Sequence, residues 1–277
     1  MKTIVTHLAP DLDAITACWL VKNFMPGWKN AQIITVPAGK TYQDKQVDTD
    51  KDIIHVDTGL GKYDHHQTNS NTCAARLVFK ALEKNYSLST KNIPVLARLT
   101  SYVNEIDHFQ DVFYPEAKAD RYEFSLAQLI EGLHKTIKND QSVIEIAFKL
   151  LDGILIVLKN KIAAESEIKS GYIFDSCYGH SIVMETGNSD SLKLAQKSGF
   201  SFGAIKDPRK GNIRIKTLPL AKYDLTPLYE KIIKVDKKAT WFLHVSRHML
   251  LNGSSKNPDF IPSSLSSAQL IAIIKKV

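Results

Sequence analysis

The order of the elements expected at the start of the chain constrains the fold most strongly. A short β-branched run at Lys2–Thr6 precedes apolar residues at helical spacing over Asp13–Phe24. Two further strand-like runs follow at Ala31–Pro37 and Asp52–Asp57. Strands that alternate with a helix at this spacing predict a parallel sheet joined by crossover helices.

The rest of the chain changes from helical to strand-rich. Asn71–Lys84 has apolar residues at helical spacing, which predicts an amphipathic helix. Ser125–Ser170 is helical throughout. Its glycines at 132 and 153 and the polar Asn139–Ser142 would divide it into two or three helices. Beyond Gly171, short strands are expected at Tyr172–Phe174, Ser181–Glu185, Ser201–Lys206, Ile213–Leu218 and Trp241–Val245, with helices at Leu225–Val235 and Ser266–Lys275.

We therefore predict an α/β protein with two domains. Residues 1–170 would form a mostly parallel sheet flanked by helices, and residues 171–277 a smaller α+β domain.

Charge and cysteine content narrow the class of protein. The formal net charge of +7 favours anionic ligands such as nucleotides, nucleic acids or phosphates, although no dense run of Lys and Arg forms a binding arm. Cys18, Cys73 and Cys177 are odd in number and widely spaced, which argues against a disulfide scaffold and against structural zinc. Cys18 and Cys73 lie in apolar helical stretches, where we expect buried thiols. The N-terminal segment is typical of a first strand and not of a signal peptide, so we expect a cytoplasmic protein with no membrane segment.

Polar residues follow the first strand at a point where ligands often bind. His7, Asp11 and Asp13 stand between Lys2–Thr6 and the next helix. In open parallel sheets, ligands gather at the carboxyl ends of the strands. Asp13 alone is equally typical of a helix N-cap, and Asp11 of a turn after Pro10.

Three more segments carry similar residues. Asp57 ends the run DIIHVD and belongs to the same expected sheet edge as His7. The tripeptide Asp64, His65 and His66 follows, and Asp107 lies in NEIDHFQD, where Asp111 is an alternative. Taken together, these carboxylates and imidazoles are ligands that manganese and similar divalent ions prefer.

The four segments resemble a known family. HLAPDLDA, VDTG, DHH and EID, in that order, look like the motifs of the DHH phosphoesterase superfamily. The superfamily includes single-strand exonucleases, oligoribonucleases, cyclic-dinucleotide phosphodiesterases and family II inorganic pyrophosphatases. The resemblance covers roughly the first 115 residues and is specific, because four ordered motifs agree.

The resemblance implies a centre of two Mn²⁺ ions, with Mg²⁺ or Co²⁺ as alternatives. One ion would be held by His7, Asp11 and Asp57, and the other by Asp13, Asp57, His65 and Asp107. Asp64 would orient a histidine, and His66 would contact the scissile phosphate as a donor or general acid.

The C-terminal half resembles the family more loosely. The Gly-Gly-Gly-His segment common in DHH proteins is absent, whereas GNIRIKTLP and TWFLHVSRHMLLNGSSKNP are similar to the C-terminal region of melanocyte-proliferating-gene-type exonucleases. Arg247, His248 and Lys256 are the candidates here for binding substrate phosphate. An ordinary turn with solvated charges explains these residues equally well.

The sequence thus predicts a metal-dependent phosphoesterase. It would hydrolyse short single-stranded oligonucleotides or cyclic dinucleotides with metal-activated water. The alternatives are an inorganic pyrophosphatase or small-nucleotide phosphatase, and a non-catalytic nucleotide-binding module. The sequence leaves the oligomeric state open, a homodimer included.

Overall fold

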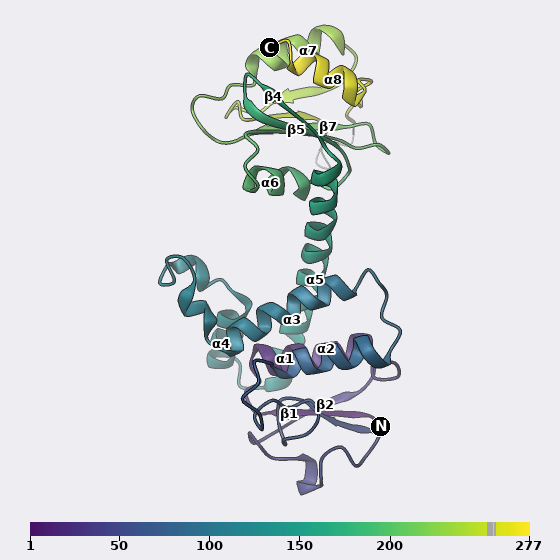
Figure 1. The fold of residues 1–277 in the computed structure, drawn as a ribbon, viewed down its shortest axis with the longest axis vertical. Coiled ribbons are helices and arrows are strands. Elements are labelled where there is room, and N and C mark those ends of the chain that lie inside the picture. Colours follow the sequence, from purple (N-terminus) through teal and green to yellow (C-terminus); the bar gives the residue numbers. More distant parts are fainter. Residues whose placement is uncertain (254–256, 258) are drawn as a thin grey trace. The chain divides into compact units, whose positions relative to one another are not determined.

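The structure is a computed structural model that describes residues 1–253, 257 and 259–277. The chain divides into two compact units, Met1–Leu158 and Lys159–Val277. The division falls inside the long helix α5 (Asp140–Ser170), which begins in the first unit. Figure 1 shows a mixed α/β architecture in which each unit has its own sheet and helices.

The first unit is built on a three-stranded parallel sheet. Its strands β1 (Thr3–His7), β2 (Gln32–Val36) and β3 (Ile53–His55) lie in the order β2-β1-β3. The helices are α1 (Leu12–Phe24), α2 (Ala74–Asn85), α3 (Ile93–Asp107) and α4 (Leu126–Thr136), with short 3₁₀ turns η1 (Tyr42–Asp44), η2 (Gln110–Phe113) and η3 (Asp120–Tyr122). The predicted parallel sheet with a crossover helix is therefore confirmed.

Helix α1 lies at the centre of this unit. It contacts β1 as well as α2, α3 and α4, and every residue from Leu12 to Val21 is buried. A helix that is covered on all sides needs no polar face, which explains its nearly continuous apolar sequence. Trp19 Nε1 donates to Asp152 Oδ1 of α5 at 2.9 Å, which anchors the long helix to this core.

The second unit contains a six-stranded mixed sheet in the order β4-β5-β6-β7-β9-β8. Its strands are β4 (Tyr172–Ser176), β5 (Gly179–Glu185), β6 (Phe202–Lys206), β7 (Ile213–Thr217), β8 (Trp241–Leu243) and β9 (Met249–Asn252). Helices α7 (Thr226–Val235) and α8 (Ser267–Ile274) contribute to the core on one face, and α6 (Asp190–Lys197) covers part of the other.

Two details differ from the sequence prediction. Glycine does not interrupt the helices, because α4 runs through Gly132 and α5 through Gly153; glycine costs a helix only about 0.5–1 kcal/mol relative to alanine. Strand β3 ends at His55, and Asp57 adopts φ 54° with its amide donating to the Tyr63 carbonyl at 3.0 Å. This left-handed residue turns the chain out of the sheet before the expected end.

The sequence prediction also omitted α3, α6 and β9. Their apolar residues form short or irregular patterns that only packing completes. Cys18 and Cys73 are buried free thiols, as expected, whereas Cys177 is exposed. No helix in the described part of the chain combines the length and hydrophobicity needed to span a lipid bilayer.

Candidate metal centre

The loop after β1 brings the first two candidate ligands to the edge of the sheet. His7 is the last residue of β1, and Asp11 is the N-cap of α1, where its Oδ1 accepts from the Ala14 amide at 3.0 Å. The Ala9 amide donates to Asp140 Oδ2 at 3.0 Å, and His134 Nε2 donates to the Pro10 carbonyl at 2.9 Å. The loop is thus fixed from α4 and α5.

Asp13 is held by the start of another helix. Its buried carboxylate accepts from the amides of Ala74 at 2.7 Å and Ala75 at 2.8 Å, the first two residues of α2. Free amides at a helix N-terminus favour a carboxylate, so α2 fixes Asp13 in one orientation. The N-cap role considered from the sequence belongs to Asp11 instead.

The turn after β3 supplies Asp57 and the two histidines. Asp64 closes this turn, because its Oδ2 accepts from the Leu60 amide and its Oδ1 lies 2.7 Å from His66 Nδ1. Asp64 therefore orients His66, and the Nε2 atom of this half-exposed ring is left for another partner. His65 points its Nε2 towards Asp57 Oδ1 at 3.4 Å.

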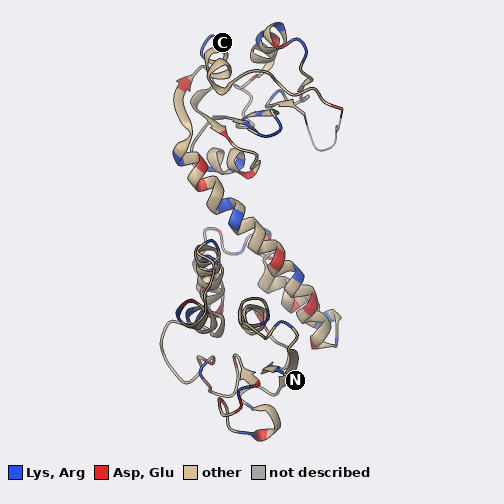
Figure 2. Ribbon diagram, turned by 90° about the vertical axis from the view of Figure 1, so that its right-hand side faces the viewer, with Lys and Arg blue, Asp and Glu red and all other residues tan. Residues whose placement is uncertain are grey.

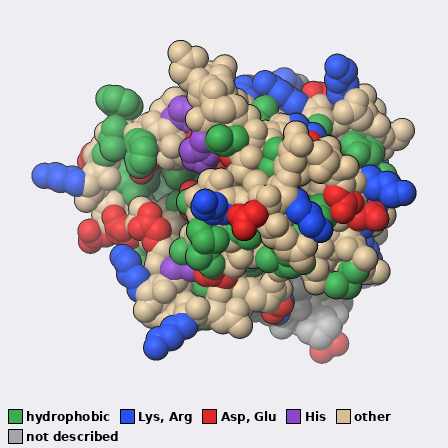
Figure 3. All heavy atoms as spheres, turned by 90° about the horizontal axis from the view of Figure 1, so that it is seen from below, with side chains coloured by type: hydrophobic (Ala, Val, Ile, Leu, Met, Phe, Trp, Pro, Cys, Tyr) green, Lys and Arg blue, Asp and Glu red, His purple; other side chains and the backbone are tan. Residues whose placement is uncertain are grey.

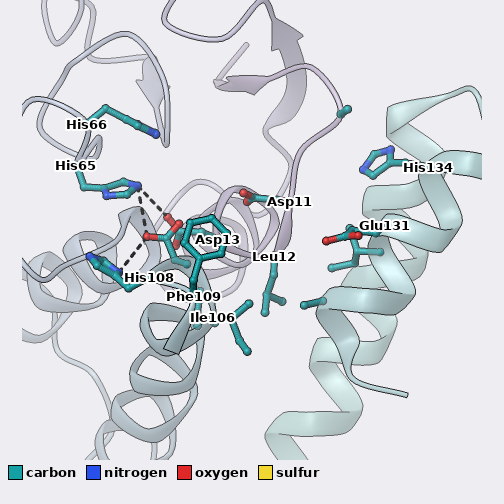
Figure 4. A pocket seen from close by; sticks show the side chains of 15 residues that line it. Asp11, Leu12, Asp13, His65, His66, Ile106, His108, Phe109, Glu131 and His134 are labelled. Atoms are coloured by element: carbon teal, nitrogen blue, oxygen red, sulfur yellow. Dashed lines mark ion pairs between the residues drawn. The ribbon is translucent and has the colours of Figure 1, made fainter. Parts of the chain in front are cut away.

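Asp107 completes the cluster from the last residue of α3. Its Oδ2 lies 3.7 Å from His65 Nε2 and 3.3 Å from His108 Nδ1. Figure 4 shows these ion pairs, together with the pair between His65 and Asp13 at 3.9 Å. The alternative Asp111 lies in η2 and belongs to none of the ligand groups found among the described residues.

The candidate ligands form overlapping groups around Asp57. Atoms of His7, Asp11 and Asp57 lie within 4.8 Å of one another, as do those of Asp13, His65 and Asp107, and those of Asp57, His65 and His66. All six residues expected to bind metal thus converge from β1, α1, α3 and the turn after β3. Asp57 approaches both histidines, with its Oδ2 3.3 Å from His7 Nε2 and its Oδ1 3.4 Å from His65 Nε2.

The donor atoms fit divalent ions. Asp57 Oδ1 and His65 Nε2 are buried and make no hydrogen bond within the described residues. Buried polar atoms without partners are costly, so two of them facing one point indicate a missing ligand. The His7 Nδ1 atom lies 2.8 Å from the Leu8 carbonyl, and its Nε2 faces the cluster, 3.3 Å from Asp57 Oδ2, where it would be available to a metal ion.

The charges of the cluster favour cations. Burial raises the pKa of Asp11, Asp13 and Asp107 above the ordinary range, and the nearby charge of Asp57 adds to this. For His65, the Asp57 carboxylate, with Oδ1 3.4 Å from Nε2, outweighs burial and raises the pKa to about 9. Burial opposes the same change at His7, yet its hydrogen bonds and the acidic neighbours raise the pKa to about 9. In the absence of metal, the site therefore binds protons instead.

Comparison with known proteins assigns the first unit to a family. Residues 4–158 match the protein family described as ChrB, C-terminal domain, which covers more than half of the chain. The chain belongs to this ChrB C-terminal domain family. The match ends where the first compact unit ends, so all six candidate ligands lie within it. No curated protein matches the sequence.

Two solved structures are similar at a low level. One is described as a DHH domain from a member of a family of ribosomal proteins, with 11% identity, a TM-score of 0.33, and coverage of 99% of this chain and 86% of that one. The other is RecJ in complex with Mg²⁺ from Thermus thermophilus, with 12% identity and a TM-score of 0.34. The alignment covers 99% of this chain and 49% of RecJ, so this chain spans about half the length of RecJ. At these TM-scores, neither similarity supports a statement about activity.

The C-terminal candidates for binding phosphate belong to the second unit of this chain, Lys159–Val277. Arg247 pairs with Asp224 through an Nη1–Oδ2 distance of 3.0 Å, and His248 Nδ1 lies 3.4 Å from Thr217 Oγ1. Lys256 lies outside the described residues. Their role in binding phosphate stays a prediction.

Sequence reasoning missed three residues near the centre and set a fourth, His108, aside as incidental. His134 and Asp140 hold the loop after β1, while His108 and Glu131 line a cavity beside the cluster. Glu131 and His134 share one face of α4 with apolar residues, a pattern that an ordinary amphipathic helix also shows. Only tertiary structure distinguishes them, because it places His134 against the loop after β1 and Glu131 at the cavity.

Proposed function

We propose that the chain is a cytoplasmic, manganese-dependent phosphoesterase of the DHH type, which hydrolyses phosphodiester bonds in short single-stranded oligonucleotides or cyclic dinucleotides. The main support is the position of Asp57, which forms one ligand group with His7 and Asp11 and whose Oδ1 lies 3.4 Å from His65 Nε2 of the group with Asp13 and Asp107. Asp57 Oδ1 and His65 Nε2 lack hydrogen-bond partners among the described residues. Carboxylate and imidazole donors in this proportion suit manganese and related ions.

Asp57 would be the shared ligand. His7, Asp11 and Asp57 would hold one ion, and Asp13, Asp57, His65 and Asp107 the other. When bound, such ions lower the pKa of water and polarise a phosphoryl group. The amides of α2 keep Asp13 oriented, and the backbone contact of His7 keeps its Nε2 available, so little rearrangement would accompany binding.

His66 would act on the substrate itself. Its Nδ1 lies against Asp64, and its side chain is 59% exposed, so its Nε2 is accessible to a bound phosphodiester. A protonated His66 would donate to the leaving oxygen, and Asp64 would stabilise the charged ring.

The substrate class rests on charge. The net charge of +7 favours polyanions, and Figure 2 shows Lys and Arg distributed over both units, with no single basic arm among the described residues. We assign the catalytic role to the N-terminal domain, residues 1–170, and substrate binding to residues 171–277, with Arg247, His248 and Lys256 as phosphate contacts.

The test compares Asp57→Ala with the wild-type protein on a panel of short RNA, short DNA, cyclic dinucleotides and pyrophosphate, each with added Mn²⁺. We expect hydrolysis of nucleotide diesters by the wild type and a loss of more than about 100-fold in the variant, since residues that bind the metal directly matter more than the residues that support them. Asp111→Asn is the matched control and should stay active.

Other outcomes would redirect the assignment. Activity confined to pyrophosphate would favour a pyrophosphatase. Binding of Mn²⁺ without turnover of any substrate would favour a non-catalytic module. Full activity in Asp57→Ala would refute the shared ligand.

A further inference from the structure

A cavity of about 680 Å³ adjoins the candidate metal centre. Asp11, Asp13, His65 and Asp107 form part of its wall, so a phosphate held at the cluster would lie directly against it. Figure 3 shows His side chains at the border of a hollow whose walls carry hydrophobic side chains. A separate cavity of about 410 Å³ lies against His7 and Asp57. The cluster thus has space on two sides for the two substituents of a phosphodiester.

The wall away from the cluster is mostly apolar. Helix α4 presents Ala127, Ile130, Glu131 and His134, which share one face of a helix because they are three or four residues apart. Val103 and Ile106 of α3 and Leu12 of α1 complete this wall. A cavity of this size with an apolar lining and few polar groups is typical of small-molecule sites.

Two side chains at this cavity lack an internal role. Glu131 is exposed, its carboxylate points into the cavity in Figure 4, and it makes no hydrogen bond or ion pair with the described part of the chain. Phe109 is 77% exposed and adopts φ 54° just after α3, so its ring stands at the cavity and outside the core. An unpaired acceptor and an exposed ring beside an apolar wall are suited to a planar ligand that carries a donor.

We propose that this cavity is a nucleobase subsite. The base attached to the phosphate at the cluster would stack on Phe109, and its exocyclic amine would donate to Glu131. Aromatic rings stack on any base, whereas a carboxylate accepts from an amine such as cytosine N4. The subsite therefore prefers cytosine to uracil, which offers a carbonyl at that position. The inference rests on the proposed phosphoesterase function and adds to it a base preference.

The test measures KM and kcat of the Mn²⁺-loaded protein with three dinucleoside phosphates, which carry cytosine, uracil or no base. We expect Phe109→Ala to raise KM about tenfold for both base-bearing substrates and to leave the abasic one unchanged. Phe113→Ala is the control, because Phe113 is 85% exposed in the same segment and does not line the cavity.

Glu131 is tested by the ratio of kcat/KM for cytosine over uracil. We expect about a tenfold preference in the wild type, its loss in Glu131→Ala, and partial retention in Glu131→Gln, which keeps an acceptor oxygen. Glu123→Gln should change nothing, since Glu123 does not line this cavity. Equal KM for the abasic and cytosine substrates in the wild type would overturn the subsite while leaving the phosphoesterase proposal intact.

A binding measurement separates the two proposals further. Titration of the Mn²⁺-loaded protein with cytidine 5′-phosphate and with ribose 5-phosphate requires no turnover. We expect cytidine 5′-phosphate to bind at least about tenfold more tightly, and Phe109→Ala to remove the difference. If no dinucleotide is hydrolysed, the phosphoesterase proposal fails, and equal affinities in this titration would then overturn the subsite as well.

Discussion

The melting temperature should report both proposed metal sites, because each bound ion stabilises the folded state. Asp57 is proposed to bind both ions and Asp107 only one, so variants of these residues should separate the two contributions. Saturation at 100 times the dissociation constant stabilises the folded state by about 2.7 kcal/mol per site, or about 5 kcal/mol for two. In a domain of this size 1 kcal/mol raises Tm by about 2–4 °C. Adding Mn²⁺ to the chelator-treated protein should therefore raise the Tm of the first unit by about 10–20 °C.

Three single substitutions should each leave a different fraction of this shift in Tm. Asp57→Asn removes the ligand common to both groups and should abolish the shift. Asp107→Asn affects only the group with Asp13 and His65, so about half of the shift should remain. Asp111→Asn should keep all of it. Calorimetry with and without Mn²⁺ measures each shift against the same variant. A full shift in Asp57→Asn would refute the assignment of both sites.

Individual contacts lead to three further predictions. His66→Gln should lower kcat by about 10²–10⁴-fold and leave the manganese-induced Tm shift unchanged, because this residue is assigned to proton transfer and not to metal binding. His134→Ala should weaken Mn²⁺ binding by about 10–100-fold in calorimetric titration, since the Pro10 carbonyl loses its donor and the loop that carries Asp11 is released. Asp236 concerns the second unit: burial raises its pKa, but hydrogen bonds from Ser263, Trp241 and Ser264 together hold the pKa below the ordinary value. Its stabilising effect should be complete above the unfolded pKa and be lost as pH falls through the lower folded pKa, so urea unfolding of Asp236→Asn should show a weaker acid dependence than the wild type.

Part of the fold and of the candidate metal site could be predicted from the sequence. His7, Asp57 and the parallel sheet were predictable, because strand ends and their polar residues are local features and parallel strands bring those ends to one edge. The resemblance of four ordered motifs added Asp107, which no local pattern distinguishes from Asp111. The continuity of α5 through Gly153 was not predictable, since the cost of a glycine is small beside the burial of the helix around it.

The sequence alone determined the types and order of the candidate ligands and the alternation of strand and helix, because these depend on side-chain chemistry and short-range periodicity. Tertiary structure decided which atoms face one another. It made Asp64 the partner of His66 and fixed Asp13 on the amides of α2, 61 and 62 residues away. It also brought Phe109 and Glu131 to the same cavity. The contacts of Asp13 with α2, and the approach of Phe109 to Glu131, join segments that are distant along the chain, whereas Asp64 and His66 lie in one turn.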